Sequence, residues 1–370
     1  MLARRGRLFF LLVITISLSL LLMSHLTSAN SQQKQAETKT DESKQADNTT
    51  NENSHWLVGS HYNTQNAITT TTTLLLNNKG IQPLEVRPTL YNMAGQSLAL
   101  PPVIVEASSH RLINLGEWAS MGGESFQQGS IKLFHYGKDL VLGAQIYLVD
   151  EKHSLSFEEK LTEIGKFDSR RLEGVWAMPS RNTDVKFALS NTTEANLSIT
   201  ARLSRSPHIT SDAQTFDLQP HETRLLDLQR DFVDGDHAAR SEAVALSLEH
   251  AGTPEALLAR AFISEAERGY SNLAQFSNPT LGKSKAYQGT GLRFGTVAGE
   301  RLMPVVVVKN TSNKTATLTG HVPYTREDGT TGRVTLPPTR LKQNALGLLD
   351  MRQVVRRSER EAIQIAGLGN

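Results

Sequence analysis

Two histidines occupy matching places in the sequence, His135 and His250, each two residues before a glycine. An imidazole can bind a metal ion or transfer a proton near neutral pH, so a recurring histidine is a candidate site residue. A site needs several groups that converge on one point. Neither histidine has a second histidine or a carboxylate at a recurring metal-binding spacing. We therefore interpret both as strand-end side chains packed near a turn.

The acidic run Asp231–Asp236 contains three aspartates beside Gly235. It faintly resembles a calcium-binding loop, but it lacks the alternating ligand spacing and the closing glutamate of that motif. We interpret it as a solvated turn. The segment Gly122–Ser125 is no nucleophile elbow, because that motif needs Gly-x-Ser-x-Gly between a strand and a helix.

Motifs for zinc proteases, phosphate loops and dinucleotide binding are missing from the sequence. The sequence therefore predicts no catalytic residue, no cofactor-binding residue, no metal ligand and no cofactor. Paired carboxylates for glycoside hydrolysis have no fixed spacing in sequence. A secreted hydrolase with its site between two domains therefore stays open as an alternative.

The elements that would position any such group are short alternating strands. In Val185–Leu203, apolar and polar residues alternate on both sides of the polar stretch Asn191–Asn196. Period-two alternation is typical of a half-buried strand, and asparagine favours turns. The stretch therefore predicts a hairpin.

The same pattern of two apolar residues, an asparagine and three apolar residues occurs again at Thr72–Leu90 and at Pro304–Val322. The spacing between copies is about 115 residues, which indicates an internal repeat. The asparagines, Asn78, Asn191 and Asn310, are interpreted as turn formers after a core strand.

These repeats divide the chain. We predict β-sandwich repeats at residues 56–153, 174–267 and 292–370, the last of them incomplete, with connectors at residues 154–173 and 268–291. Phe157, Leu161 and Ile164 have helical spacing, but nearby glycines favour an extended arm over a helix. The predicted fold class is all-β, with tandem immunoglobulin-like antiparallel β-sandwiches.

The N-terminus has the order of a secretory signal. Residues 1–29 run from three arginines through an apolar core to Thr27-Ser-Ala29, a signal peptide with a cleavage site. The alternative is an uncleaved anchor formed by residues 8–26. Residues 30–55 are almost free of apolar side chains and are predicted to be a disordered linker.

The composition limits the partners. The formal net charge is +2, and removal of the leader arginines leaves −1, so nothing favours binding to nucleic acid. The chain has no cysteine, which excludes disulfides and thiolate chemistry. Contact with a membrane is expected only through the N-terminal segment.

The strand spacing over about residues 56–370 resembles that of tandem immunoglobulin-like or fibronectin-type β-sandwich repeats in exported, largely uncharacterised bacterial proteins. The resemblance is architectural. No cysteine pair is present, and Trp176 lies at the entrance of a repeat. It implies a non-enzymatic structural or interaction protein, secreted or in the cell envelope, with a protein or glycan partner. An uncleaved, membrane-anchored binding protein is the further alternative.

Overall fold

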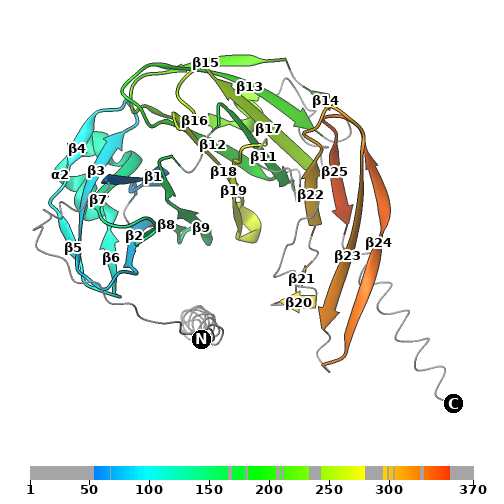
Figure 1. Ribbon diagram of the computed structural model, residues 1–370, viewed down its shortest axis with the longest axis horizontal. Coiled ribbons are helices and arrows are strands. Elements are labelled where there is room, and N and C mark those ends of the chain that lie inside the picture. Colours follow the sequence, from blue (N-terminus) through cyan, green and yellow to red (C-terminus); the bar gives the residue numbers. More distant parts are fainter. Residues whose placement is uncertain are drawn as a thin grey trace, which may run out of the picture. The chain divides into compact units, whose positions relative to one another are not determined.

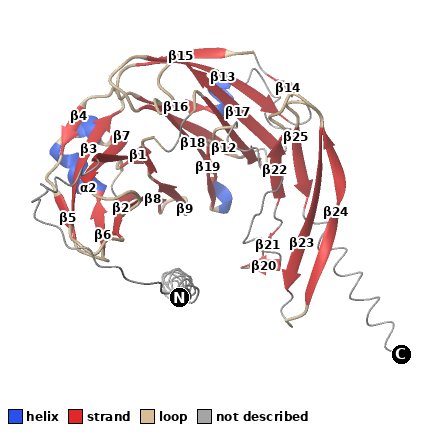
Figure 2. Ribbon diagram, in the orientation of Figure 1, coloured by secondary structure: helices blue, strands red, loops and turns tan. Residues whose placement is uncertain are grey.

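The protein is all-β, with several antiparallel sheets and few helical residues (Figures 1 and 2), so the predicted fold class is confirmed at that level. The computed structural model describes residues 54–350 except 67, 166–168, 179, 181, 206–208, 211, 233–242, 280–294, 298–299, 303–304 and 326–328. The predicted signal peptide or anchor lies outside the described residues. The linker predicted for residues 30–55 does so too, except that Ser54 and His55 already belong to the first strand.

The first sandwich consists of two sheets that share one core. One sheet has the order β10-β1-β7-β3-β4, with β5 also paired to β3, and the other has the order β6-β2-β8-β9. The strands of the first sheet are β1 (Ser54–Asn63), β3 (Leu84–Asn92), β4 (Ser97–Ala99), β5 (Val103–Val105), β7 (Gln128–Tyr136) and β10 (Thr162–Glu163). Those of the second are β2 (Thr70–Asn78), β6 (His110–Asn114), β8 (Leu142–Asp150) and β9 (Leu155–Lys160).

Alternation of apolar residues builds this core. Leu57, Val86 and Leu133 of the first sheet are buried in one cluster with Leu74 and Ile146 of the second. Successive side chains of a strand point to opposite faces, so the residues between them face outward. The short helices α2 (Leu115–Met121) and η1 (Glu124–Phe126) follow β6, and Leu115 at the start of α2 is part of the same core.

The second sandwich has the same plan. One sheet has the order β11-β17-β13-β14, with β15 also paired to β13, and the other has the order β16-β12-β18-β19. The bounds are β11 (Arg171–Ala177), β12 (Asp184–Asn191), β13 (Leu197–Arg205), β14 (Ile209–Thr210), β15 (Gln214–Leu218), β16 (Thr223–Asp227), β17 (Ala243–His250), β18 (Leu257–Glu265) and β19 (Tyr270–Gln275), with the helices α3 (Leu228–Phe232) and η3 (Ala266–Arg268). Phe187, Leu189, Ile199 and Leu246 lie in the core between the two sheets.

The C-terminal described part contains three two-stranded sheets, β20-β21, β22-β25 and β23-β24. The bounds are β20 (Gly295–Val297), β21 (Glu300–Leu302), β22 (Val305–Lys309), β23 (Ala316–Thr325), β24 (Thr331–Leu341) and β25 (Leu346–Asp350). Val322 and Val334 are buried together, with Val306 packed against them. Residues 351–370 lie outside the described residues, so the proposed incompleteness of a third repeat stays a prediction.

The hairpin predicted at Val185–Leu203 is wrong, although both of its strands exist. β12 pairs with β16 and β18, whereas β13 pairs with β14, β15 and β17 in the other sheet. The chain therefore crosses from one sheet to the other at Asn191. Strands facing each other across a core show the same alternation as strands of a hairpin, so the period could not distinguish the two arrangements.

The recurring asparagines form the same turn in three places. The buried amides of Asn78, Asn191 and Asn310 each donate to the carbonyl oxygen four residues on, at 2.7 Å in every case. Each side-chain oxygen accepts from the backbone N–H two residues on, at 2.8, 3.0 and 3.1 Å. Their interpretation as turn formers is thereby confirmed.

The two segments predicted as connectors contain strands that pair with the sheets of the sandwiches. Residues 154–173 include β9, which pairs with β8, and β10, which pairs with β1, so most of this segment belongs to the sheets of the first sandwich. Residues 268–291 likewise include β19, which pairs with β18. Backbone pairing with a sheet edge, which composition does not reveal, decides these boundaries. In the described part of the chain, no helix has the length and apolar character needed to cross a membrane.

Candidate functional site

A group of ionisable side chains lies at one corner of the first sandwich. His55, near the start of β1, lies opposite His135, near the end of β7. Their rings stack with centroids 5.2 Å apart and planes 16° apart. Both are buried, with 8% and 3% of their surface exposed.

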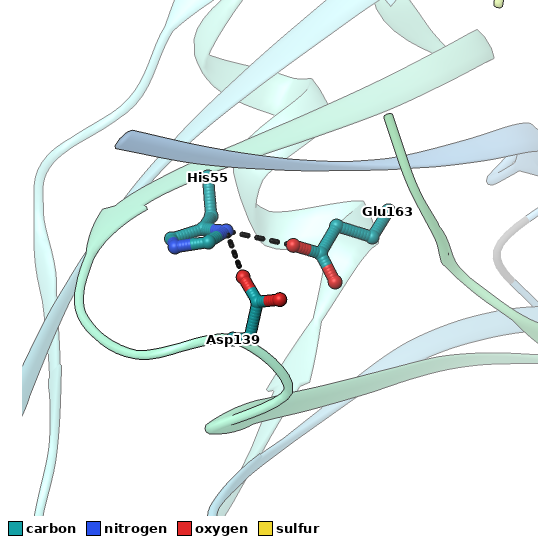
Figure 3. Close-up of side chains that lie close together, drawn as sticks. All are labelled: His55, Asp139 and Glu163. Atoms are coloured by element: carbon teal, nitrogen blue, oxygen red, sulfur yellow. Dashed lines mark hydrogen bonds and ion pairs between the residues drawn. The ribbon is translucent and has the colours of Figure 1, made fainter. Parts of the chain in front are cut away.

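Two carboxylates face the same nitrogen of His55 (Figure 3). Nδ1 lies 2.7 Å from Oε1 of Glu163 and 3.5 Å from Oδ1 of Asp139. The side chain of Glu163 is 12% exposed and that of Asp139 is 63% exposed. The group therefore opens to solvent on the side of Asp139.

Three local features bring these residues together. Glu163 is placed by the short pairing of β10 with β1, where it lies opposite Leu57. Asp139 lies in the turn between β7 and β8, which is closed by a bond from the N–H of Val141 to the carbonyl of Lys138. Leu140 in this turn has a positive φ of 61°, a conformation that is costly for a branched side chain.

The electrostatics of the corner follow from burial. Desolvation lowers the pKa of His135, the charge of His55 acts in the same direction, and the charge of Glu163 opposes them. Burial therefore favours the neutral form of His135. Nε2 of His55 and Nδ1 of His135 have no hydrogen-bond partner among the described residues.

One imidazole nitrogen and two carboxylates are donors that divalent transition metals accept. Within the described part of the chain, His55, Asp139 and Glu163 are the one group of three histidine or acidic residues whose ligand atoms converge, all within 4.8 Å of one another. None of the three was predicted as a ligand from the sequence, where ligands were expected at recurring positions. One sequence signal did point to this place: His55 lies beside the first apolar strand, and that strand pairs with the strand that carries His135.

The histidines and the aspartate considered from the sequence lie at strand ends and in a short helix. His135 lies in the corner but faces the ring of His55, and His250 lies at the corresponding corner of the second sandwich. Asp231 lies in the short helix α3 and not in a turn as predicted; it accepts from the N–H of Asp227 at 2.6 Å and pairs with Arg230. Residues 234 and 236 lie outside the described residues. Gly122 caps the end of α2, and Ser125 lies in η1.

The second corner has the same backbone but different side chains. Residue 250 lies opposite residue 170, as residue 135 lies opposite residue 55, and His250 N–H donates to the carbonyl of Arg170. Arg170 donates from Nε to the carbonyl of Gly252 at 2.9 Å. The offset that relates His135 to His250 relates Asp139 to Pro254 and Glu163 to Asn278, so no carboxylate occupies these positions.

A second ionisable group joins the two sandwiches. Glu159 of β9 accepts from the N–H and the hydroxyl of Ser60 at 2.8 and 2.9 Å, and its Oε1 lies 3.4 Å from Nε of Arg260 on β18. Arg260 also donates to Thr162 Oγ1 at 2.8 Å. Both charged side chains are buried. Burial raises the pKa of Glu159 and lowers the pKa of Arg260, and their mutual attraction opposes both shifts.

A similar group lies between the second sandwich and β22. Lys309 donates to Glu173 Oε2 at 2.6 Å and to Ser247 Oγ at 2.7 Å, and the two charged side chains are 4% and 5% exposed. Arg171 adds a bond of 3.1 Å to the other carboxylate oxygen. Each junction therefore contains a buried carboxylate, and both of its oxygens accept hydrogen bonds from neighbouring groups.

Two hollows among the described residues lie elsewhere. The larger has a volume of about 550 Å³ and is lined by polar residues such as Thr71, Asn114 and Glu117. A narrow one lies at the first junction, between Lys132, Ser190 and His221. Neither is lined by His55, Asp139 or Glu163. Comparison with protein-family models, with curated proteins and with solved structures finds no match to this chain.

Proposed function

We propose that the protein is a non-enzymatic structural or interaction protein that acts outside the cytoplasm and is built of repeated, immunoglobulin-like β-sandwich modules. The observation that carries this proposal is the use of buried charge: among the described residues, the lysine or arginine ion pairs whose two side chains are both at most 5% exposed join one module to the next. Glu159 and Arg260 hold the first junction, and Glu173 and Lys309 hold the second. A protein whose modules are joined in this way presents a continuous surface to a partner.

The chemistry of Glu159 supports a structural role over a catalytic one. A carboxyl with a raised pKa between two domains is what the hydrolase alternative would need of a general acid. However, both oxygens of Glu159 accept hydrogen bonds from Ser60, and the side chain is buried. A general acid must reach the substrate, so these contacts favour the interaction protein.

The outward face of the first sheet is a candidate surface for the protein or glycan partner. Trp56, Phe134 and Tyr136 alternate with core residues along β1 and β7, and their rings are in contact, with centroids 4.5 and 4.7 Å apart. Nζ of Lys132 lies 4.4 Å from the ring centroid of Trp56. Tyr136 is 48% exposed, whereas Trp56 and Phe134 are half-buried. Surface aromatic side chains beside a cation are typical of binding surfaces.

Export is tested by following the protein in its own cells. We expect it in the extracytoplasmic fraction, with a mature N-terminus at or near Asn30. An intact N-terminus in the membrane fraction would support the anchored alternative, and an intact N-terminus in the cytoplasm would contradict the proposal. The partner surface is tested by sedimentation with isolated cell envelopes. Tyr136→Ala should weaken binding severalfold, whereas Tyr147→Ala, on the other sheet, should leave it unchanged.

A further inference from the structure

We propose that His55, Asp139 and Glu163 form a binding site for one divalent transition-metal ion, for which Zn²⁺ is the natural probe. This proposal does not depend on the module function proposed above. It rests on the convergence of three ligand atoms from three separate segments, the start of β1, the β7–β8 turn and β10.

One separation between the donors fits a shared ion directly, and a second needs a small change. Zinc lies about 2.1 Å from nitrogen and oxygen ligands, so two ligands of a tetrahedral site lie about 3.4 Å apart. Nδ1 of His55 and Oδ1 of Asp139 are 3.5 Å apart. The 2.7 Å between Nδ1 and Glu163 is a hydrogen-bond distance, so the ion would replace this proton and widen that gap slightly.

The burial pattern also fits. Packing against His135 fixes the ring of His55, and pairing with β1 fixes the backbone of Glu163, so two ligands are ordered before an ion arrives. Asp139 lies on an exposed turn and leaves the remaining coordination positions open to water. An ordered pair with an exposed third ligand provides both affinity and an entry path.

Other histidine–carboxylate pairs in the described residues provide matched controls. His153 Nδ1 lies 2.7 Å from Asp150, and His221 Nε2 lies 2.8 Å from Glu194. Neither pair belongs to a converging group of three. If any histidine beside a carboxylate bound zinc, these pairs would do so as well.

The competing explanation is that the bond from His55 to Glu163 only fastens β10 to β1. Both explanations predict that Glu163→Gln lowers stability, so that variant cannot decide. Asp139→Asn can decide, because Asp139 lies on an exposed turn and its loss leaves the bond between His55 and Glu163 intact. Asp150→Asn is its matched control.

The test is a Zn²⁺ titration by calorimetry of tag-free, chelator-treated protein, with thermal unfolding measured in parallel. We expect one high-affinity Zn²⁺ per chain in the wild type and in Asp150→Asn. Asp139→Asn should weaken binding at least about tenfold, the scale on which lost metal-site contacts act. Saturating Zn²⁺ should raise the midpoint of unfolding by about 5 °C in the wild type.

Visible absorption of the Co²⁺-loaded protein reports ligation independently of folding. A nitrogen-containing site of low coordination number gives a band that His55→Gln should abolish and His153→Gln should retain. Equal Zn²⁺ affinities in Asp139→Asn and Asp150→Asn would overturn the site. So would a wild type that binds no Zn²⁺, or that binds Ca²⁺ more tightly than Zn²⁺.

Discussion

The corresponding corners of the two sandwiches have one backbone arrangement and different chemistry. In the first, His135 stacks on His55, and two carboxylates reach Nδ1 of His55. In the second, His250 lies opposite Arg170, which donates to a backbone carbonyl. The histidine found in both corners therefore belongs to the shared strand structure. The capacity to bind metal depends on carboxylates that only the first corner has.

The two junctions differ in a comparable way. At the strand position where β1 carries Val58, β11 carries Glu173, and the second junction therefore takes its acid from the sheet itself. The first junction takes its acid, Glu159, from the edge strand β9. The two sandwiches therefore have similar strands but place their buried acids on different ones. This difference predicts that mutations at the two junctions lower stability by different amounts.

The largest effect is expected at the first junction. Arg260→Ala should lower the free energy of unfolding by about 3–5 kcal/mol, because it leaves the charge of Glu159 buried without an opposite charge beside it. Lys309→Ala should cost less, since Arg171 and Ser247 still bond to Glu173. Denaturant unfolding measures both. Equal losses, or a larger loss for Lys309→Ala, would contradict the ranking.

Acid should weaken the first junction next most strongly. Burial, with the charge of Lys186 acting in the same direction, lowers the pKa of His61 to about 4, against 6.5 in the unfolded chain. The unfolded state therefore binds more protons between pH 6.5 and 4, and stability falls as the pH falls through this window. The loss amounts to about 3 kcal/mol.

The variant His61→Gln should flatten the profile of stability against pH in this window, because it removes the titrating ring. His61 lies 5.7 Å, centroid to centroid, from Phe262 of the second sandwich, so the loss should appear as opening of the first junction. Hydrogen exchange at β1 and β18 measures this opening. An unchanged profile in His61→Gln would assign the pH dependence to other groups.

The asparagine turns should respond alike in both sandwiches. Asn78→Ala and Asn191→Ala each remove two or more hydrogen bonds from the side-chain amide to backbone carbonyls, and each should cost about 2 kcal/mol. Chemical denaturation of the two variants compares them directly. Costs that differ by several kcal/mol would show that the two turns are not equivalent.

The smallest effect is expected from a change in the second corner. Arg170→His restores a pair of histidines there but supplies no carboxylate, so it should create no second Zn²⁺ site. Calorimetry should still give one Zn²⁺ per chain. A second Zn²⁺ site in this variant would show that the histidine pair, and not the carboxylates, determines binding.

The strands and turns could be predicted from the sequence better than the group of His55, Asp139 and Glu163, for a physical reason. Core alternation and turn formation are local requirements, so residues such as Leu189 and Asn191 reveal strands and turns from their neighbours alone. Which strands pair is a tertiary property, and the hairpin at Val185–Leu203 was wrong for that reason. His55, Asp139 and Glu163 come from three distant segments that only the folded sheet brings together, and they do not recur.

The central claim is that the corner of the first sandwich binds a metal ion through His55, Asp139 and Glu163, which have no counterparts in the second sandwich. The most direct measurement is the number and affinity of Zn²⁺ ions bound by the wild type and by Asp139→Asn, with Asp150→Asn alongside. The account predicts one ion in the wild type and in Asp150→Asn, and binding at least about tenfold weaker in Asp139→Asn. Zinc binding that is missing in the wild type, or unaffected by Asp139→Asn, would contradict it.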